Sequence, residues 1–169
     1  YFLTISSLLL LFGRLGDIFG YRRVYISGLA GFVISSILCS LSSTVNMLVL
    51  FRAIQGLATG MMMSVPYAVI TAAFPPAERG RALGINAVSI AAGLAIGPLL
   101  GGIVASSMGW RLVFYINVPI GVAGLIWANR TLPEEKGEPG NLDILGAATA
   151  FISLSSFLLS VNRFQNLGL

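Results

Sequence analysis

Long runs of residues without a single charge constrain this chain more than any other feature. Residues 53–77, 82–110, 112–129 and 144–162 are among these runs. A helix needs about 20 apolar residues to span the ~30 Å hydrocarbon core of a bilayer, whereas the buried helices of soluble proteins usually have shorter apolar runs. We therefore predict several transmembrane helices; a soluble bundle of buried core helices is the alternative.

The overall composition agrees with a membrane protein. Hydrophobic residues make up 56% of the 169 residues and charged residues 9%, and the mean hydropathy is +0.90. The net charge of +4 does not indicate a nucleic-acid partner, because nine of the ten basic residues fall outside the predicted spans, where loops collect them. Histidine is absent and the one cysteine, Cys39, lies in an apolar run, which excludes disulfides and sites built from His and Cys. We expect no metal site and no nucleic-acid partner.

Polar turns and prolines divide the apolar runs into spans. Because the chain begins inside an apolar stretch, without the features of a signal peptide, residues 1–12 are predicted to be the end of a helix in a fragment of a longer protein. Pro66 and Pro119 can kink two of the later spans. The predicted spans are residues 24–41, 47–71, 82–106, 112–129 and 142–160, and the loops or turns are 13–23, 42–46, 72–81, 107–111 and 130–141.

The basic residues predict the orientation of these spans. Loops on one side of the membrane hold Arg14, Arg22, Arg23, Arg79, Arg81, Arg130 and Lys136, and those on the other side hold Arg111 and Arg163. Lys and Arg accumulate in cytoplasmic loops, so loops 13–23, 72–81 and 130–141 are predicted to be cytoplasmic. The chain is thus expected to be a multi-pass protein of the cell membrane.

Three short motifs resemble the signatures of the major facilitator superfamily. "GRLGDIFGYRR", residues 13–23, is similar to Gly-x-Leu-x-Asp-x-x-Gly-x-Arg/Lys, which lies between the second and third helices, although many members have a basic residue where this chain has Tyr21. "LFRAIQGLATG", residues 50–60, contains the Arg-x-x-Gln-Gly of the fourth helix. "GLAIGPLLGG", residues 93–102, resembles the Gly-x-x-x-Gly-Pro-x-x-Gly-Gly that marks antiporters on the fifth helix.

This resemblance implies an all-α polytopic membrane fold. Residues 1–129 would form part of the N-terminal six-helix bundle, from the end of helix 2 to helix 6, with helix 1 missing. Residues 130–141 would be a solvated cytoplasmic linker, and residues 142–169 an extra seventh helix and an outer turn. That extra span and "GWRLVFYINVPIG", residues 109–121, resemble the fourteen-helix branch of drug:proton antiporters.

Arg52 lies inside a predicted span, about 9 Å from the outer turn at ~1.5 Å per residue. An arginine at such a depth costs at least about 2.5–3.5 kcal/mol and should face a cavity or a partner, unless it snorkels to the outer surface. Gln55 and Gly56 lie one turn further along the same face. In the family, an acid on the first helix often supports proton coupling. We therefore predict that Arg52 favours the charged form of such an acid, and that the three residues belong to the transport path.

Two further groups of residues are predicted to act during conformational change. In the family, the loop that 13–23 resembles latches the cytoplasmic side to the other half of the protein. We predict a gate formed by Gly13, Asp17, Gly20, Arg22, Arg23 and Glu78, in which Asp17 holds the other half and Arg22 or Arg23 pairs with Glu78. The antiporter motif is formed by Gly93, Gly97, Pro98, Gly101 and Gly102. Three of its glycines repeat every four residues, so they allow close helix packing that would seal a leak path; simple packing is the alternative.

These features together predict proton-driven export of small amphipathic compounds by alternating access. The proton gradient would supply the energy, and no cofactor is expected. The expected partners are the substrate, protons, membrane lipid and the missing C-terminal half. A nutrient uniporter or symporter and a non-transporting membrane scaffold remain alternatives. An enzyme is not expected, because the spans contain no histidine, no paired carboxylates and no nucleophile elbow.

Overall fold

The computed structural model describes residues 2–132 and 137, and residues 146, 148, 149, 152, 153, 156, 157 and 160, with side chains described from Leu11 onward. In this part of the chain every regular element is a helix. Four stretches are long and apolar enough to cross a membrane, namely Tyr21–Ser40, Val45–Ala73, Pro76–Met108 and Trp110–Thr131. The predicted all-α polytopic membrane fold is therefore confirmed.

Seven helices follow one another along the described residues. They are α1 (Phe2–Phe19), α2 (Tyr21–Ser40), α3 (Val45–Ser64), α4 (Pro66–Ala73), α5 (Pro76–Met108), α6 (Trp110–Tyr115) and α7 (Asn117–Thr131). The predicted linker and seventh span fall largely outside the described residues, although those described between 146 and 160 are helical.

The loop predicted at residues 13–23 is wrong. Helix α1 continues through Phe19 and α2 begins at Tyr21, so that Gly20, with a φ of 90°, separates them. Each glycine in a helix costs about 1 kcal/mol relative to alanine, but α1 packs along both α2 and α3, and packing overrides local propensity. Gly20 makes the corner because glycine adopts a positive φ without steric cost.

The loop at 72–81 and the turn at 107–111 are also shorter than predicted. Helix α5 already begins at Pro76, the first helical position, where the missing N–H of proline removes no hydrogen bond. The same helix continues past Pro98 to Met108, and Gly109, with a φ of 91°, separates it from α6. Short connections between α4 and α5 and between α5 and α6 therefore replace the longer loop and turn that residue composition predicted.

Two predicted spans are each divided near a proline. Helix α3 ends at Ser64 and α4 begins at Pro66; likewise α6 ends at Tyr115 and α7 begins two residues before Pro119. Proline cannot donate the hydrogen bond that would continue a helix, which explains both interruptions. Each interruption thus lies next to a proline that was expected to disturb its span.

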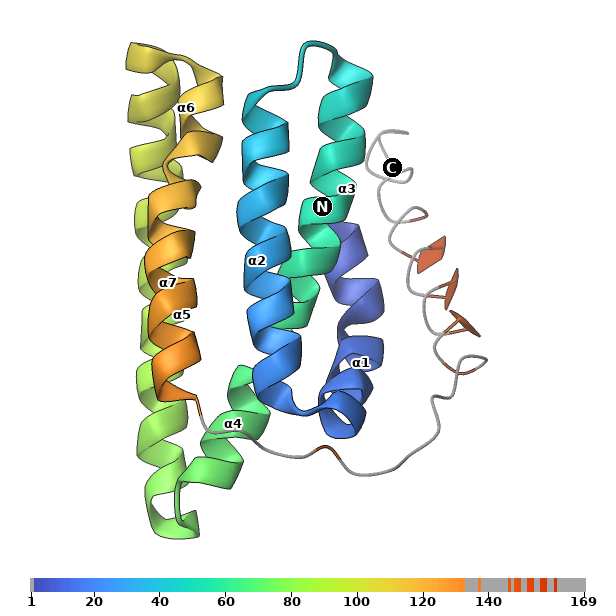
Figure 1. The fold of residues 1–169 in the computed structure, drawn as a ribbon, viewed down its shortest axis with the longest axis vertical. Helices are drawn as coiled ribbons and strands as arrows, with labels where there is room; N and C mark the ends of the chain where they lie inside the picture. Colours follow the sequence, from blue (N-terminus) through green and yellow to red (C-terminus); the bar gives the residue numbers. More distant parts are fainter. Residues whose placement is uncertain are drawn as a thin grey trace.

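Helix α2 lies at the centre of the described bundle (Figure 1). It packs against α3 on one side and against α6 and α7 on the other, whereas α5 packs mainly on α4 and α6. The α1–α2 corner, α4 and the end of α7 lie at one end of the bundle, and the α2–α3 turn and α6 lie at the other (Figure 1). This arrangement places the described parts of the predicted cytoplasmic segments at a common end.

Candidate functional site

The guanidinium of Arg52 contacts side chains of two helices. Its Nη1 donates a hydrogen bond to Oε1 of Gln55, one turn along α3, at 2.9 Å. Its central carbon also lies 4.7 Å from the centroid of the Phe114 ring on α6. A cation above an aromatic face is attracted by the ring quadrupole, so Phe114 and Gln55 both stabilise the arginine in place.

Gln55 extends this contact into a buried polar chain across α3 and α2. The side chain is 1% exposed, and its Nε2 donates to Oγ of Ser36 at 2.8 Å. Ser36 is fully buried and donates in turn to the backbone oxygen of Phe32 at 2.7 Å. Thr59 donates to the backbone oxygen of Gln55 at 2.8 Å, and Gly56 is buried beside them. A buried amide is costly unless both its ends are bonded, and here both are.

Ser36 and Phe114 were not among the predicted site residues. A helical serine often bonds the carbonyl one turn earlier, so nothing in the sequence separates Ser36 from Ser35, which does the same. Phe114 belongs to the segment "GWRLVFYINVPIG", but its spacing from Arg52 carries no signal. Tertiary packing alone brings the two residues to Gln55 and Arg52.

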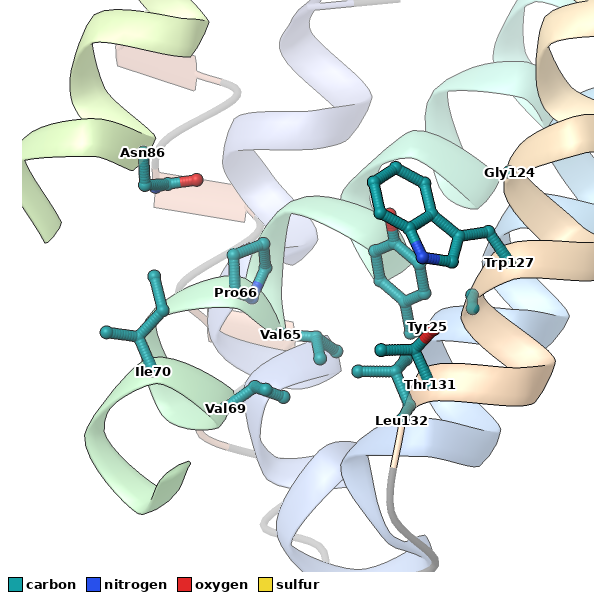
Figure 2. A pocket seen from close by; sticks show the side chains of 11 residues that line it. Tyr25, Val65, Pro66, Val69, Ile70, Asn86, Gly124, Trp127, Thr131 and Leu132 are labelled. Atoms are coloured by element: carbon teal, nitrogen blue, oxygen red, sulfur yellow. The ribbon is translucent and has the colours of Figure 1, made fainter. Parts of the chain in front are cut away.

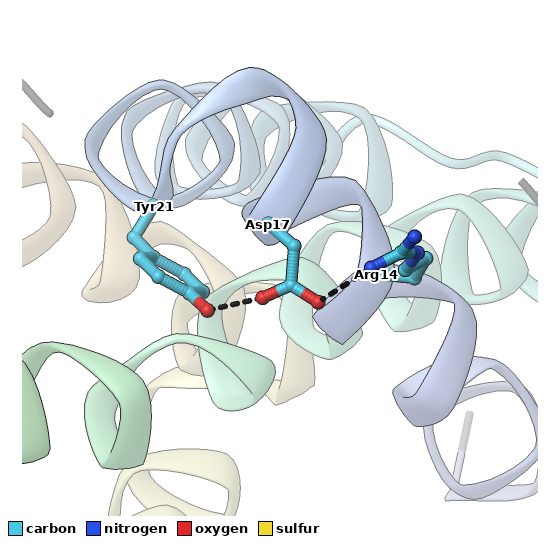
Figure 3. Close-up of polar contacts among 3 residues, drawn as sticks. All are labelled: Arg14, Asp17 and Tyr21. Atoms are coloured by element: carbon cyan, nitrogen blue, oxygen red, sulfur yellow. Dashed lines mark hydrogen bonds and ion pairs between the residues drawn. The ribbon is translucent and has the colours of Figure 1, made fainter. Parts of the chain in front are cut away.

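Asp17 is held within its own corner of the bundle (Figure 3). Tyr21 donates from its hydroxyl to Oδ1 of Asp17, while Nη1 of Arg14 lies 3.5 Å from Oδ2. Asp17 is in the last turn of α1, where the helix dipole disfavours a negative charge, and these two contacts offset that effect. Gly16 makes room for the tyrosine, since a Cβ there would lie 2.6 Å from Cδ1 of Tyr21.

The two arginines that follow have different surroundings from those predicted. Nη2 of Arg22 donates to both oxygens of Asn129 near the end of α7, at 2.8 and 2.9 Å. Glu78 lies in the first turn of α5, where the helix dipole favours a carboxylate. Within the described residues, no ion pair joins Glu78 to Arg22 or to Arg23. Among the described residues, the predicted pairing of Glu78 with Arg22 or Arg23 is therefore not seen as an ion pair.

The glycines of the antiporter motif lie along α5, which has no buried residue in this chain. A Cβ placed at Gly93, Gly97, Gly101 or Gly102 would meet no other atom within 4 Å in the described part of the structure. Closer helix contacts occur instead at Gly28 of α2. A Cβ there would lie 2.8 Å from Cβ of Met61 and 2.9 Å from the backbone oxygen of Ala58.

A cavity of about 380 Å³ lies where α3 gives way to α4 (Figure 2). Tyr25 and Trp127 line it on the side of α2 and α7, and Asn86 of α5 lies across from them (Figure 2). Arg52 and Gln55 do not line it. The cavity is therefore separate from the Arg52 network.

No metal site is visible among the described residues, because no three of their His, Cys, Asp or Glu side chains form a group that could hold an ion.

Comparison with known proteins gives the family. A sequence model of the Major Facilitator Superfamily matches residues 1–165. The chain is 34% identical over 162 residues to "Multidrug resistance protein 3" of Bacillus subtilis, covering 95% of this chain and 32% of the relative. It is 36% identical over 148 residues to the "Tetracenomycin C resistance and export protein" of Streptomyces glaucescens, covering 86% of this chain and 28% of the relative.

A third relative is named for a different role. The "Riboflavin transporter RibZ" of Clostridioides difficile is 33% identical over 168 residues, covering 98% of this chain and 37% of that protein. The chain spans about a third of the length of these curated relatives. The family match, the three motifs and the helical bundle agree, and the chain belongs to the Major Facilitator Superfamily of integral membrane transporters.

Proposed function

We propose that this chain is part of the N-terminal half of a proton-driven exporter of small amphipathic compounds in the cell membrane. The observation that carries the proposal is the charged side chain of Arg52, held inside an apolar span by Gln55 and Phe114. A membrane protein retains an intramembrane charge at considerable cost, which makes such a residue a candidate for ion or substrate movement.

The antiporter motif and the relatives support export over uptake. Residues 93–102 match the fifth-helix signature of antiporters at every fixed position, and several relatives carry resistance or export in their names. The segments 109–121 and 142–162 further favour the fourteen-helix branch. In this proposal the substrate site lies near the midplane, between this half and the second half of the protein.

The proposed role of Arg52 is electrostatic. A guanidinium close to a carboxylate favours its charged form and so lowers its pKa. Arg52 would act in this way on an acid of a helix outside this chain, and would help that acid to release its proton when substrate is exchanged. No cofactor enters this scheme, because the proton gradient supplies the energy.

Substrate-dependent proton movement in vesicles of the whole transporter tests the proposal. Arg52→Ala is expected to reduce proton release per substrate by at least about tenfold, and Arg52→Lys by less, because charge remains but the planar guanidinium is lost. Arg81→Ala is the control, since Arg81 is exposed near the start of α5 and takes no part in the contacts of Arg52. Unchanged coupling in both Arg52 variants would contradict the proposal.

Uptake of a nutrient is the second candidate, and the similarity to a protein named as a riboflavin transporter favours it. The direction of coupled movement separates the two. A proton-driven exporter releases protons from the vesicles when substrate enters in exchange. A symporter moves protons and substrate in the same direction, and a uniporter moves substrate without protons. A scaffold would show no substrate-dependent movement at all.

A further inference from the structure

The orientation of the Gln55 amide depends on a residue of another helix. Ser36 uses its proton to bond the backbone oxygen of Phe32, so its oxygen is left to accept from Nε2 of Gln55. The amide oxygen of Gln55 must then face Nη1 of Arg52, where it accepts a hydrogen bond. A reversed amide would set donor against donor at Arg52, because a guanidinium has no acceptor. It would also set acceptor against acceptor at Ser36, whose proton is already donated to Phe32.

Phe114 fixes the guanidinium from a second direction. Its ring is 8% exposed, and it meets Trp110 edge to face at a centroid distance of 6.2 Å. The neighbouring Arg111 lies over the Trp110 ring at 4.5 Å and donates to the backbone oxygen of Ser42 at 3.0 Å. The aromatic pair is thus tied to the turn between α2 and α3, and Phe114 has little freedom to leave Arg52.

We infer that Ser36 and Phe114 are positioning residues for Arg52, Ser36 acting through Gln55 and Phe114 acting directly. This inference rests on the proposed function, in which Arg52 lowers the pKa of a proton-carrying acid. The two contacts restrict the guanidinium from two sides, one by a directed hydrogen bond and one by an aromatic face. A restricted guanidinium interacts with its acid more strongly than a mobile one, because charge interactions weaken with distance and hydration.

The pH dependence of substrate-driven proton release in the whole transporter tests this role. Phe114→Leu and Ser36→Ala should each loosen Arg52, raise the pKa of the acid and move the midpoint to higher pH by about 0.5–1 unit. Phe114→Trp keeps the aromatic face and Ser36→Thr keeps the hydroxyl, so each variant is expected to retain the original midpoint. Phe12→Leu is the matched control, because Phe12 is 7% exposed and lies on α1.

A second measurement separates positioning from general damage to the fold. In a Gln55→Leu background, the hydrogen bonds that link Ser36 to Arg52 through Gln55 are absent. Adding Ser36→Ala to that variant should therefore shift the midpoint no further. The inference is overturned if Arg52→Ala shifts the midpoint while Phe114→Leu and Ser36→Ala match Phe12→Leu. If Arg52→Ala itself leaves the midpoint unchanged, the proposed function fails instead.

Discussion

Arg22, at the start of α2, donates from one nitrogen to both the backbone and the side-chain oxygen of Asn129, 107 residues further along the chain. The contact joins the first turn of α2 to the last turn of α7, where a cation also complements the helix dipole. An arginine of the signature motif thus connects two helices of the described bundle.

Arg22→Ala is expected to lower the free energy of unfolding by about 1 kcal/mol, since two charge-assisted hydrogen bonds are lost at an exposed site. Asn129→Ala should cost less, because the backbone acceptor remains. Arg23→Ala, a change at the exposed neighbouring residue, is the control. Thermal unfolding of the purified transporter in detergent measures all three. Equal losses at positions 22 and 23 would show that the contact contributes nothing specific.

Gly28 is predicted to be essential for the packing of α2 on α3. In Gly28→Ala the new methyl group would overlap the backbone of α3 at Ala58, which cannot move without shifting the helix. Overpacking of this kind costs about 1–3 kcal/mol. Gly80→Ala is the comparison, because a Cβ at Gly80 meets open space and alanine favours helix. A thermal midpoint unaffected by Gly28→Ala would refute the close approach of the two helices.

Asp17→Asn is expected to move the transporter towards its inward-facing state, because the proposed latch to the other half loses its charge. A weak latch worth about 0.5–1 kcal/mol would change the ratio of the two states by about two- to fivefold. The ratio of inward-facing to outward-facing protein is measured by alkylating single cysteines along α3 with reagents added to either side of the membrane.

Tyr21→Phe tests whether the carboxylate itself is responsible. This variant keeps Asp17 and removes the hydroxyl that donates to it. It should therefore not reproduce the inward shift. If both variants give the same shift, the effect arises from disturbing the α1–α2 corner, and the latch is not needed to explain it.

Gly97→Leu is predicted to cause a proton leak across the membrane, in addition to any loss of folded protein. Gly93, Gly97 and Gly101 share one face of α5, and a large side chain there would prevent close packing against a partner helix. Ala95→Leu changes the opposite face of the same helix and serves as the control. A pH-sensitive dye measures the proton flux of each variant in vesicles without substrate. If folded Gly97→Leu protein passes no more protons than Ala95→Leu, the glycines do not seal a proton leak.

Cysteines at positions 23 and 79 should react with a membrane-impermeant reagent from the same side, the cytoplasm. Both positions lie at the end of the bundle that holds the α1–α2 corner and the start of α5 (Figure 1). A cysteine at Ser43, in the turn between α2 and α3, should react from the opposite side. Labelling of positions 23 and 79 from different sides would contradict the predicted orientation.

Local features of the sequence were sufficient to predict the membrane helices and the shared face of Arg52 and Gln55. The apolar runs predicted the membrane helices because their length alone satisfies the bilayer. The shared face of Arg52 and Gln55 followed from their spacing, since residues three apart on a helix are neighbours, whereas the hydrogen bond between them was not predicted. Local propensity was a poorer guide at Gly13 and Gly16, where helix packing maintains a helix that glycine by itself disfavours.

Residue order alone was enough to predict a set of membrane helices with a charge inside one of them and the motifs of a transporter family. That Ser36 and Phe114 meet the Arg52 network, and that α2 approaches α3 at Gly28, emerged only from the folded bundle. These helices are apolar on nearly every face. Their hydrophobic pattern therefore carries little information about which side faces a neighbour, and the rotation and register of each helix come from side-chain packing between segments far apart in the chain.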